Sequence, residues 1–190
     1  LLTPGKPFGP RKIMEGVKKA ACWGVNMVLR NDGTLWTWGF NNDGQLGNGS
    51  TQSFYSPQQA GMIMSGVSDI TSGDRHAMAI KTDGTLWGCG NNDYGKIGVG
   101  TKQECVKTPT QILSGVRSVI TASNHTLAIL NNGTLMAWGS NFDGALGDGT
   151  KIHRRKPVKI HTNVSKAASG DTFTVFITND GNFFFTGSFE

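Results

Sequence analysis

The sequence predicts an all-β fold of the β-propeller class. Three observations lead to this prediction: an Asn/Asp-Gly pair recurs about every 50 residues, each pair lies between short alternating apolar segments, and no helical period of adequate length competes. A repeat of about 50 residues that contains three or four short strands is typical of a propeller blade.

Each recurring pair predicts a tight β-hairpin, because both central residues of such a turn need positive φ. The pairs are Asp32-Gly33, Asp83-Gly84, Asn132-Gly133 and Asp180-Gly181. The same string follows the first three pairs, as "GTLWTWGFNNDGQLGNG", "GTLWGCGNNDYGKIGVG" and "GTLMAWGSNFDGALGDG", and the fourth copy reads "GNFFFTGSFE".

The other strands of each unit follow from the same register. The strand before each turn has one face of large residues and one of mainly small residues, and this pattern predicts packing against a neighbouring sheet on both sides. An inner strand of small residues begins at "GVKKAA", "GVSDIT", "GVRSVI" and "NVSKAA". An outer strand is expected in "SPQQAGMI", "TPTQIL" and "KPVKI", with proline at its start, because an edge strand tolerates proline.

These units predict a single partial propeller domain over residues 1–190. We expect repeat units at 16–65, 66–114, 115–162 and 163–190, with 1–15 as a closing outer strand, because "GPRKIMEGV" (9–17) matches "TPTQILSGV" (108–116). The chain thus carries about 3.5 to 4 blades, where propellers typically have four to eight. Three alternatives follow: a half propeller whose ends form one composite blade, a ring completed by dimerisation (twice three and a half blades is seven), or a fragment of a longer propeller.

The repeated strings carry a family resemblance. "WGFNNDGQLGNGST", "CGNNDYGKIGVGT" and "WGSNFDGALGDGT", with "GDRHAMAIKTDG" and "ASNHTLAILNNG", resemble the regulator-of-chromosome-condensation repeat, in wording more similar to bacterial members. The resemblance implies a propeller, usually seven-bladed and non-catalytic, that binds macromolecules through loops on its two faces. Members include the nuclear exchange factor for the GTPase Ran, which docks on nucleosomes, and a secreted bacterial β-lactamase inhibitor, so the fold does not select the function.

Composition narrows the choice of partner and of chemistry. With 18 Lys+Arg against 13 Asp+Glu, the net charge of +5 permits an acidic partner without requiring one. No apolar run reaches the roughly 18 residues of a membrane span. The cysteines Cys22, Cys89 and Cys105 form no CxxC pair, which argues against a zinc site, and a Cys89–Cys105 disulfide stays open.

The motifs indicate no catalytic, cofactor or metal site. The Gly-rich loop lacks the Lys-Ser/Thr of a phosphate-binding loop and the D-x-D-x-D spacing of a calcium loop, so its glycines are interpreted as turn residues. His76 and His125 occupy equivalent positions that carry Val25 and Phe173 in the other units, which favours packed structural histidines. His153 and His161 have no Cys or carboxylate ligand set nearby.

Partner recognition is expected from residues that the repeat leaves free. Exposed aromatic loop residues are favoured anchors at protein interfaces, although partial burial against a neighbouring blade is the alternative. The aromatic candidates are Phe40, Phe54, Tyr55, Tyr94 and Phe142. The basic run "KIHRRKPVK" adds Arg154, Arg155 and Lys156 as a patch for nucleic acid or an acidic protein, unless it is a solvated loop between strands.

The expected function is therefore a non-catalytic protein-interaction module without a cofactor, with self-association as a further expectation. The alternatives are a chromatin- or nucleic-acid-associated propeller, a guanine-nucleotide exchange factor-like propeller, and a secreted enzyme-inhibitor-like propeller. We expect an extracellular or cell-envelope location in a bacterium rather than a cytoplasmic one.

Overall fold

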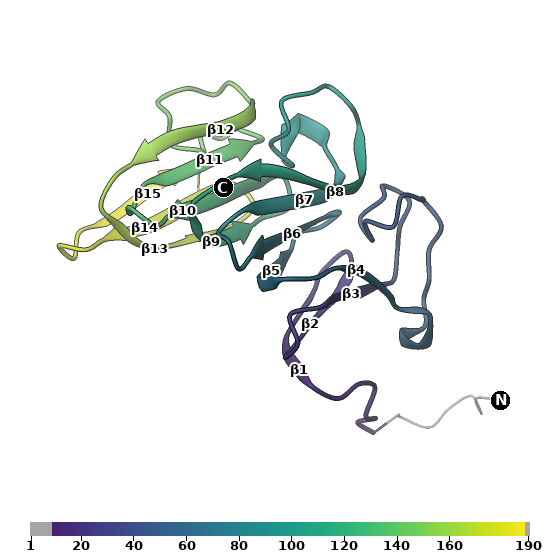
Figure 1. Ribbon diagram of the computed structural model, residues 1–190. Helices are drawn as coiled ribbons and strands as arrows, with labels where there is room; N and C mark the ends of the chain where they lie inside the picture. The colour runs from purple at the N-terminus through teal and green to yellow at the C-terminus, as the bar shows by residue number, and fades with distance from the viewer. Residues whose placement is uncertain (1–8, 189–190) are drawn as a thin grey trace.

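The computed structural model describes residues 9–188 and consists of antiparallel β-sheets that lie side by side in chain order (Figure 1). Each sheet is a meander in which strand order follows the sequence, so each is one blade. The first and fourth blades lie at opposite ends of an arc, not in a closed ring (Figure 1). This architecture confirms the predicted all-β propeller class.

The first blade comprises β1 (Val17–Cys22), β2 (Asn26–Arg30), β3 (Leu35–Trp38) and β4 (Gly61–Met64). The second comprises β5 (Val67–Ser72), β6 (His76–Lys81), β7 (Leu86–Asn91) and β8 (Cys105–Leu113). The third comprises β9 (Val116–Thr121), β10 (His125–Leu130), β11 (Leu135–Gly139) and β12 (Arg154–His161). The fourth comprises β13 (Val164–Ser169), β14 (Phe173–Thr178) and β15 (Phe183–Gly187). Two short 3-10 turns lie at Pro57–Gln59 and Asp93–Gly95.

The predicted hairpin turns join the second and third strands of every blade. Their glycines have φ of 79° at Gly33, 79° at Gly84, 78° at Gly133 and 84° at Gly181. Residues other than glycine rarely adopt this left-handed conformation, which explains the recurring glycines. The predicted positive φ at the preceding Asp or Asn is wrong, because among the described residues other than glycine only Tyr94 and Asn163 have positive φ. The side chain before the glycine caps the turn instead, as Asp32 does by accepting a hydrogen bond from the Thr34 N–H at 3.0 Å.

The core lies between the blades, not inside any one of them. Met27, Leu29 and Leu35 of the first blade pack with Val67 and Ile70 of the second. Equivalent positions form the cluster between the second and third blades and the cluster between the third and fourth. The alternation of large and small faces along the second strand thus reflects one neighbouring blade on each side.

The prolines of the outer strands are not where the sequence predicted them. Pro109 and Pro157 lie within β8 and β12 instead of at their start, and Pro57 lies in the 3-10 turn before β4. The register of β7–β8 shifts between Gly88 and Gly90, opposite the proline segment. A bulge on an edge strand accommodates a residue without an N–H, because no further strand needs that donor.

The predicted closing strand at residues 1–15 stays a prediction. Residues 9–14 adopt no regular secondary structure, and residues 1–8 of the predicted segment 1–15 lie outside the described residues. Three blades have four strands and the fourth has three.

Candidate partner-binding surface

A buried asparagine organises each loop that follows a third strand. The side-chain oxygen of Asn41 accepts a hydrogen bond from the Leu46 N–H at 2.9 Å, and its amide donates to the Gln52 carbonyl at 2.9 Å. Asn141 makes the same bonds with Leu146 and Ile152, at 3.0 and 3.3 Å. Because these loops are closed by their own side chains, they are scaffold and not ligand cradles.

These rigid loops present an aromatic cluster between the second and third blades. We define the aromatic cluster as Tyr94, Phe142 and His153. The ring centroids are 5.3 Å apart for Tyr94 and Phe142, 4.3 Å for Phe142 and His153, and 4.9 Å for Tyr94 and His153. Phe142 is 58% exposed and Tyr94 is 36% exposed. The cluster is therefore an ordered apolar surface that is open to solvent.

His153 was not predicted as a site residue, and it is the centre of the cluster. Its Nδ1 accepts a hydrogen bond from the Asn141 N–H at 2.9 Å, which fixes the ring beside Phe142. Partial burial, and secondarily the charge of Arg155, lowers the pKa of His153. A neutral ring suits both the accepting Nδ1 and the apolar neighbours. The sequence carries no signal for this role, because Tyr94 belongs to the loop of another blade.

The other three predicted aromatic residues lie on the first blade. Phe40 is 40% exposed and Tyr55 is 73% exposed. Phe54 packs against the core between the first two blades, and its main chain exchanges two hydrogen bonds with Gly39. Among the described residues, no ring contact joins these three to the aromatic cluster. The predicted aromatic set is thus split over two places.

Two of the three residues of the predicted basic patch make contacts within the chain. Arg154 forms an ion pair with Asp148, with Nε and Oδ2 2.6 Å apart, and it begins β12. Burial raises the pKa of Asp148, but hydrogen bonds from Thr150 and Arg154 outweigh this effect and hold that pKa below its usual value. Arg155 donates to the Thr101 carbonyl at 3.4 Å, and Lys156 is exposed. Residues 154–159 of the run lie in the outer strand β12, and residues 151–153 lie in the loop before it.

The two equivalent histidines bridge neighbouring blades. Nε2 of His76 lies 3.2 Å from Oγ1 of Thr126, and Nε2 of His125 lies 3.3 Å from Oγ1 of Thr174. Burial lowers the pKa of His76 to about 3 and that of His125 to about 4. Both rings are buried and contact the next blade through Nε2, in agreement with the packed-histidine prediction. Nδ1 of His76 is buried without a hydrogen-bond partner among the described residues.

The cysteines and the possible metal ligands were the other candidates for a chemical role. Cys22, Cys89 and Cys105 are free thiols, so the Cys89–Cys105 bridge is not formed. Burial raises the pKa of Cys89 to about 12. Residues 9–188 contain no group of three metal-ligating side chains and no helix of the length and hydropathy that would span a membrane.

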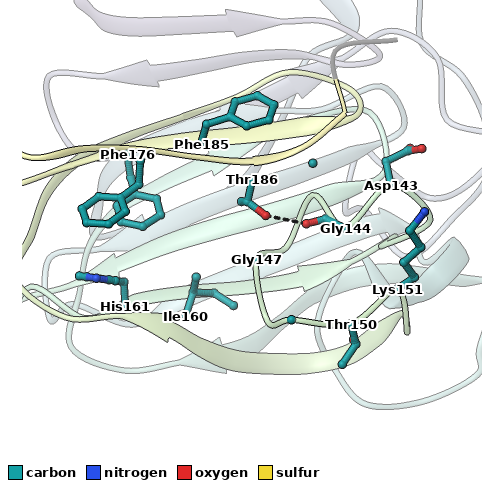
Figure 2. A pocket seen from close by; sticks show the side chains of 13 residues that line it. Asp143, Gly144, Gly147, Thr150, Lys151, Ile160, His161, Phe176, Phe185 and Thr186 are labelled. Atoms are coloured by element: carbon teal, nitrogen blue, oxygen red, sulfur yellow. Dashed lines mark hydrogen bonds between the residues drawn. The ribbon is translucent and has the colours of Figure 1, made fainter.

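A groove of about 600 Å³ separates β12 and its preceding loop from β15 (Figure 2). Ile160 and His161 line one wall, and Phe176 and Phe185 line the other (Figure 2). Thr186 crosses the groove and donates through Oγ1 to the Gly144 carbonyl at 2.8 Å. The groove is lined by loop glycines on one side and aromatic rings on the other.

Comparison with known proteins identifies the repeat. A model for the regulator of chromosome condensation (RCC1) repeat matches residues 32–80, 83–129 and 132–177, and a second model of that repeat matches 67–96. Each of the first three matches begins at a hairpin turn and ends in the second strand of the next blade. The sequence repeat is therefore offset from the structural blade.

Similar proteins agree with this match. Protein RCC2 of Homo sapiens is 28% identical over 112 residues, which are 55% of this chain and 22% of that protein. The crystal structure of human WBSCR16 has a TM-score of 0.80 at 24% identity and covers 90% of this chain and 47% of that chain. Yeast RCC1 (Prp20), solved with Kap60 bound, has a TM-score of 0.78 at 20% identity and covers 90% and 43%. The chain therefore spans less than half of each of these proteins, and the two solved structures show the fold alone.

Proposed function

The chain belongs to the regulator of chromosome condensation (RCC1) repeat family, and from this premise we propose that it is a non-catalytic protein-interaction module. The aromatic cluster of Tyr94, Phe142 and His153 makes the central contact. Yeast RCC1, a protein of the same fold, has been solved with another protein bound. We extend the same proposal, a protein-interaction role, to any longer protein that contains these blades.

The exposure of Phe142 is the observation that carries the proposal. Its ring is 58% exposed although Tyr94 and His153 hold it in a fixed orientation. Binding a partner would bury this ring without a large loss of side-chain entropy, because packing has already restricted it. Large, rigid aromatic side chains are enriched among the residues that dominate interface energies.

The contacts of three histidines support a non-enzymatic role. His76 and His125 are buried and bound to hydroxyl groups of the next blade, so neither faces a substrate. His153 accepts a main-chain hydrogen bond through Nδ1 and contacts two aromatic rings. No nucleophile lies beside an accessible base in these three environments.

Nucleic-acid or chromatin association is the less favoured alternative. The charge of Arg154 is neutralised by Asp148 at 2.6 Å, which leaves Lys156 as the exposed member of the predicted basic trio. Phosphate binding needs several available cations and gives a steep salt dependence. Exchange-factor activity, inhibition of a secreted enzyme and an extracellular bacterial location are further proposals that no residue geometry favours.

Affinity for a captured partner tests the proposal. The immobilised chain is used to capture binding proteins from the source cells, and the purified partner is then titrated with wild-type chain, Phe142→Ala and the control Met62→Ala. Met62 is 56% exposed on β4, away from the cluster. Loss of an interface anchor weakens binding about tenfold or more. Equal affinities for wild type and Phe142→Ala would refute the assignment.

A further inference from the structure

The buried asparagine of each loop after a third strand also has its main-chain N–H bonded to the segment that closes the loop. In the first blade, Asn41 N–H donates to Oγ of Ser53 at 2.9 Å. In the second blade, Asn92 N–H donates to the main-chain carbonyl of Glu104 at 2.7 Å. A buried N–H without an acceptor costs free energy, so a loop of this kind needs an acceptor at this position.

The third blade supplies this acceptor from a titratable side chain. Asn141 is 0% exposed, and its N–H donates to Nδ1 of His153 at 2.9 Å. The acceptors in the first two blades, a hydroxyl group and a peptide carbonyl, keep their protonation state on mild acidification. Histidine, with an ordinary pKa of about 6.5, does not. Among the three described loops, this closure alone depends on pH.

Only the neutral ring of His153 can make this hydrogen bond. In the imidazolium both ring nitrogens carry a hydrogen, so neither can accept. Protonation therefore sets two donors, the Asn141 N–H and Nδ1–H, against each other. Since an N–H at a buried residue is costly to leave without an acceptor, the closed loop and the protonated ring are incompatible.

The ring that closes this loop also holds Phe142 in place. The centroids of His153 and Phe142 are 4.3 Å apart, and those of His153 and Tyr94 are 4.9 Å apart. Phe142 directly follows Asn141, so the hydrogen bond and the ring contact restrain the same stretch of main chain. Without His153, Phe142 keeps one ring contact among the described residues, the edge-on contact with Tyr94.

The surroundings of His153 oppose its protonation in the closed loop. Partial burial, and secondarily the positive charge of Arg155, lowers the pKa of His153. The intervening Arg154 is paired with Asp148, with Nε and Oδ2 2.6 Å apart. The closed loop therefore holds a neutral ring at neutral pH.

The elements packed against the ring supply no counter-ion. The 3-10 turn Asp93–Gly95 contributes the uncharged ring of Tyr94, and the loop after β11 contributes Phe142. Asp93 and Asp143 are the carboxylates next to these two residues in the chain, and neither forms an ion pair with the histidine within residues 9–188. An imidazolium at this position is more stable in water than against the two rings.

The titratable closure and the exposed aromatic ring occur at the same junction of blades. Where the first blade meets the second, the three equivalent positions carry carboxylates: Asp43, Asp93 and Glu104. That junction has neither the aromatic surface nor a loop closed by a histidine. The two features therefore belong together at the junction of the second and third blades.

We propose that protonation of His153 opens the aromatic cluster, so that the chain binds its partner at neutral pH and releases it in mildly acidic surroundings. This inference rests on the proposed function, because it concerns regulation of the same surface. When the ring is neutral, it holds Phe142 in one orientation for the partner. When the ring is protonated, binding has to order Phe142 again and restore the bond to Asn141, which weakens affinity.

The direction of the pH dependence follows from proton linkage. In the open loop the histidine lies in water with a pKa of about 6.5, whereas the closed loop resists protonation. As the pH falls below about 6.5, the ratio of open to closed loops rises by up to about tenfold per pH unit, until the pKa of the closed form is reached. The cluster is therefore closed at neutral pH and opens on acidification.

Hydrogen exchange of three amides in the wild-type chain tests the opening without a partner. The protection factor of Asn141 N–H, measured by NMR, is expected to fall by up to about tenfold per pH unit below about pH 6.5, in step with the ring resonances of His153. Asn41 N–H and Asn92 N–H are controls in the same molecule, because their acceptors do not titrate in this range. A decrease at Asn141 no larger than at the two controls overturns the proposal.

His153→Asn separates the proton from the hydrogen bond. The side-chain oxygen of asparagine accepts at every pH, so the protection of Asn141 N–H is expected to follow the two control amides in this variant. His161→Asn is the matched control, because His161 also follows the chain into the third blade's outer strand but contacts Phe176 instead of the cluster. Wild-type pH dependence is expected to persist in His161→Asn. Its persistence in His153→Asn, or its loss in His161→Asn, overturns the proposal.

Affinity at two pH values tests the consequence for binding. The partner purified in the capture experiment is titrated with the wild-type chain and with His153→Asn at about pH 7.5 and about pH 5.5. The wild-type chain is expected to bind about fivefold to tenfold more weakly at the lower pH, and the affinity of His153→Asn, whatever its value, is expected to change less than about twofold. Equal pH dependence of the two proteins overturns this proposal. Failure of the aromatic-cluster proposal shows separately, as equal affinity of the wild-type chain and Phe142→Ala at neutral pH.

Discussion

The ring of Tyr94 meets the ring of Phe142 edge-on, with centroids 5.3 Å apart, although the two residues belong to loops of different blades. They also occupy different positions within those loops, since Phe142 directly follows its buried asparagine and Tyr94 does not. The contact is therefore a property of this pair of blades and not of the repeat. It explains why an exposed phenylalanine has a fixed orientation.

Phe142→Ala is expected to affect binding far more than folding. A favourable edge-on aromatic pair contributes about 0.5–1.5 kcal/mol, and the exposed ring contributes little burial. We expect the free energy of unfolding to decrease by about 1 kcal/mol, measured by urea denaturation with tryptophan fluorescence. A loss several times larger would show that Phe142 belongs to the core.

Trp138→Ala is expected to affect folding far more than binding. Trp138 is fully buried between the second and third blades, and its Nε1 donates to the Lys96 carbonyl at 2.9 Å. Truncation of a buried tryptophan costs about 3–5 kcal/mol of folding free energy. The matched Trp38→Ala variant removes the equivalent residue of the first blade, against which residues 9–188 place no preceding blade. We expect Trp38→Ala to cost less than Trp138→Ala in the same denaturation experiment; equal losses would contradict the assignment of the core to the spaces between blades.

Folding stability is expected to fall on mild acidification because of the buried histidines. Burial, with smaller effects from Lys96 and His125, lowers the pKa of folded His76 to about 3, below the value of about 6.5 expected when it is unfolded. The unfolded chain therefore takes up protons that the folded chain does not as the pH falls below about 6.5, and stability decreases until the folded pKa is reached.

The variant His76→Phe tests this cause. Phe173 occupies the equivalent position in the fourth blade, with Gly170 beside it as Gly73 lies beside His76. The variant is expected to reduce the slope of stability against pH between about pH 6 and 4 by close to one proton. An unchanged slope in denaturation curves recorded across this range would assign the acid sensitivity to other groups.

Asn163 lies in the turn that connects β12 with β13, and substitutions there test why this turn needs a left-handed residue. It adopts φ of 61° where the equivalent positions carry glycine. A β-branched residue is strongly disfavoured in this left-handed conformation, so Asn163→Val is expected to cost about 1–2 kcal/mol or more, whereas Asn163→Gly keeps the backbone geometry. Asn179→Ala removes the 2.7 Å bond from Asn179 to the Asn163 side chain and is the control. Equal destabilisation by Asn163→Val and Asn163→Gly would contradict the backbone explanation.

The repeat made most of the fold predictable from the sequence. Asx-Gly pairs specify the hairpins because few residues adopt positive φ, and alternating faces specify strands with a blade on each side. The positions of Pro109 and Pro157 inside β8 and β12 were not predictable in this way, because a bulge on an edge strand leaves no periodic signal.

The candidate site was only partly predictable. Tyr94 and Phe142 were found because they interrupt a constant loop, but their contact depends on how two blades pack. The sequence predicts no role for His153, whose contacts with both rings arise from the packing of two blades. The sequence places Arg154 in a positive patch, but in the structure its charge is paired with Asp148. Sequence spacing does not reveal which charges are paired.

The most direct test of the account is site-specific photo-crosslinking from the aromatic cluster. A benzophenone amino acid is placed at Phe142 and, as the control, at Met62, and each protein is irradiated in extracts of the source cells. We predict a discrete covalent adduct with another protein from position 142 and not from position 62. No adduct from position 142, or the same adducts from both positions, would contradict partner binding by the cluster of Tyr94, Phe142 and His153.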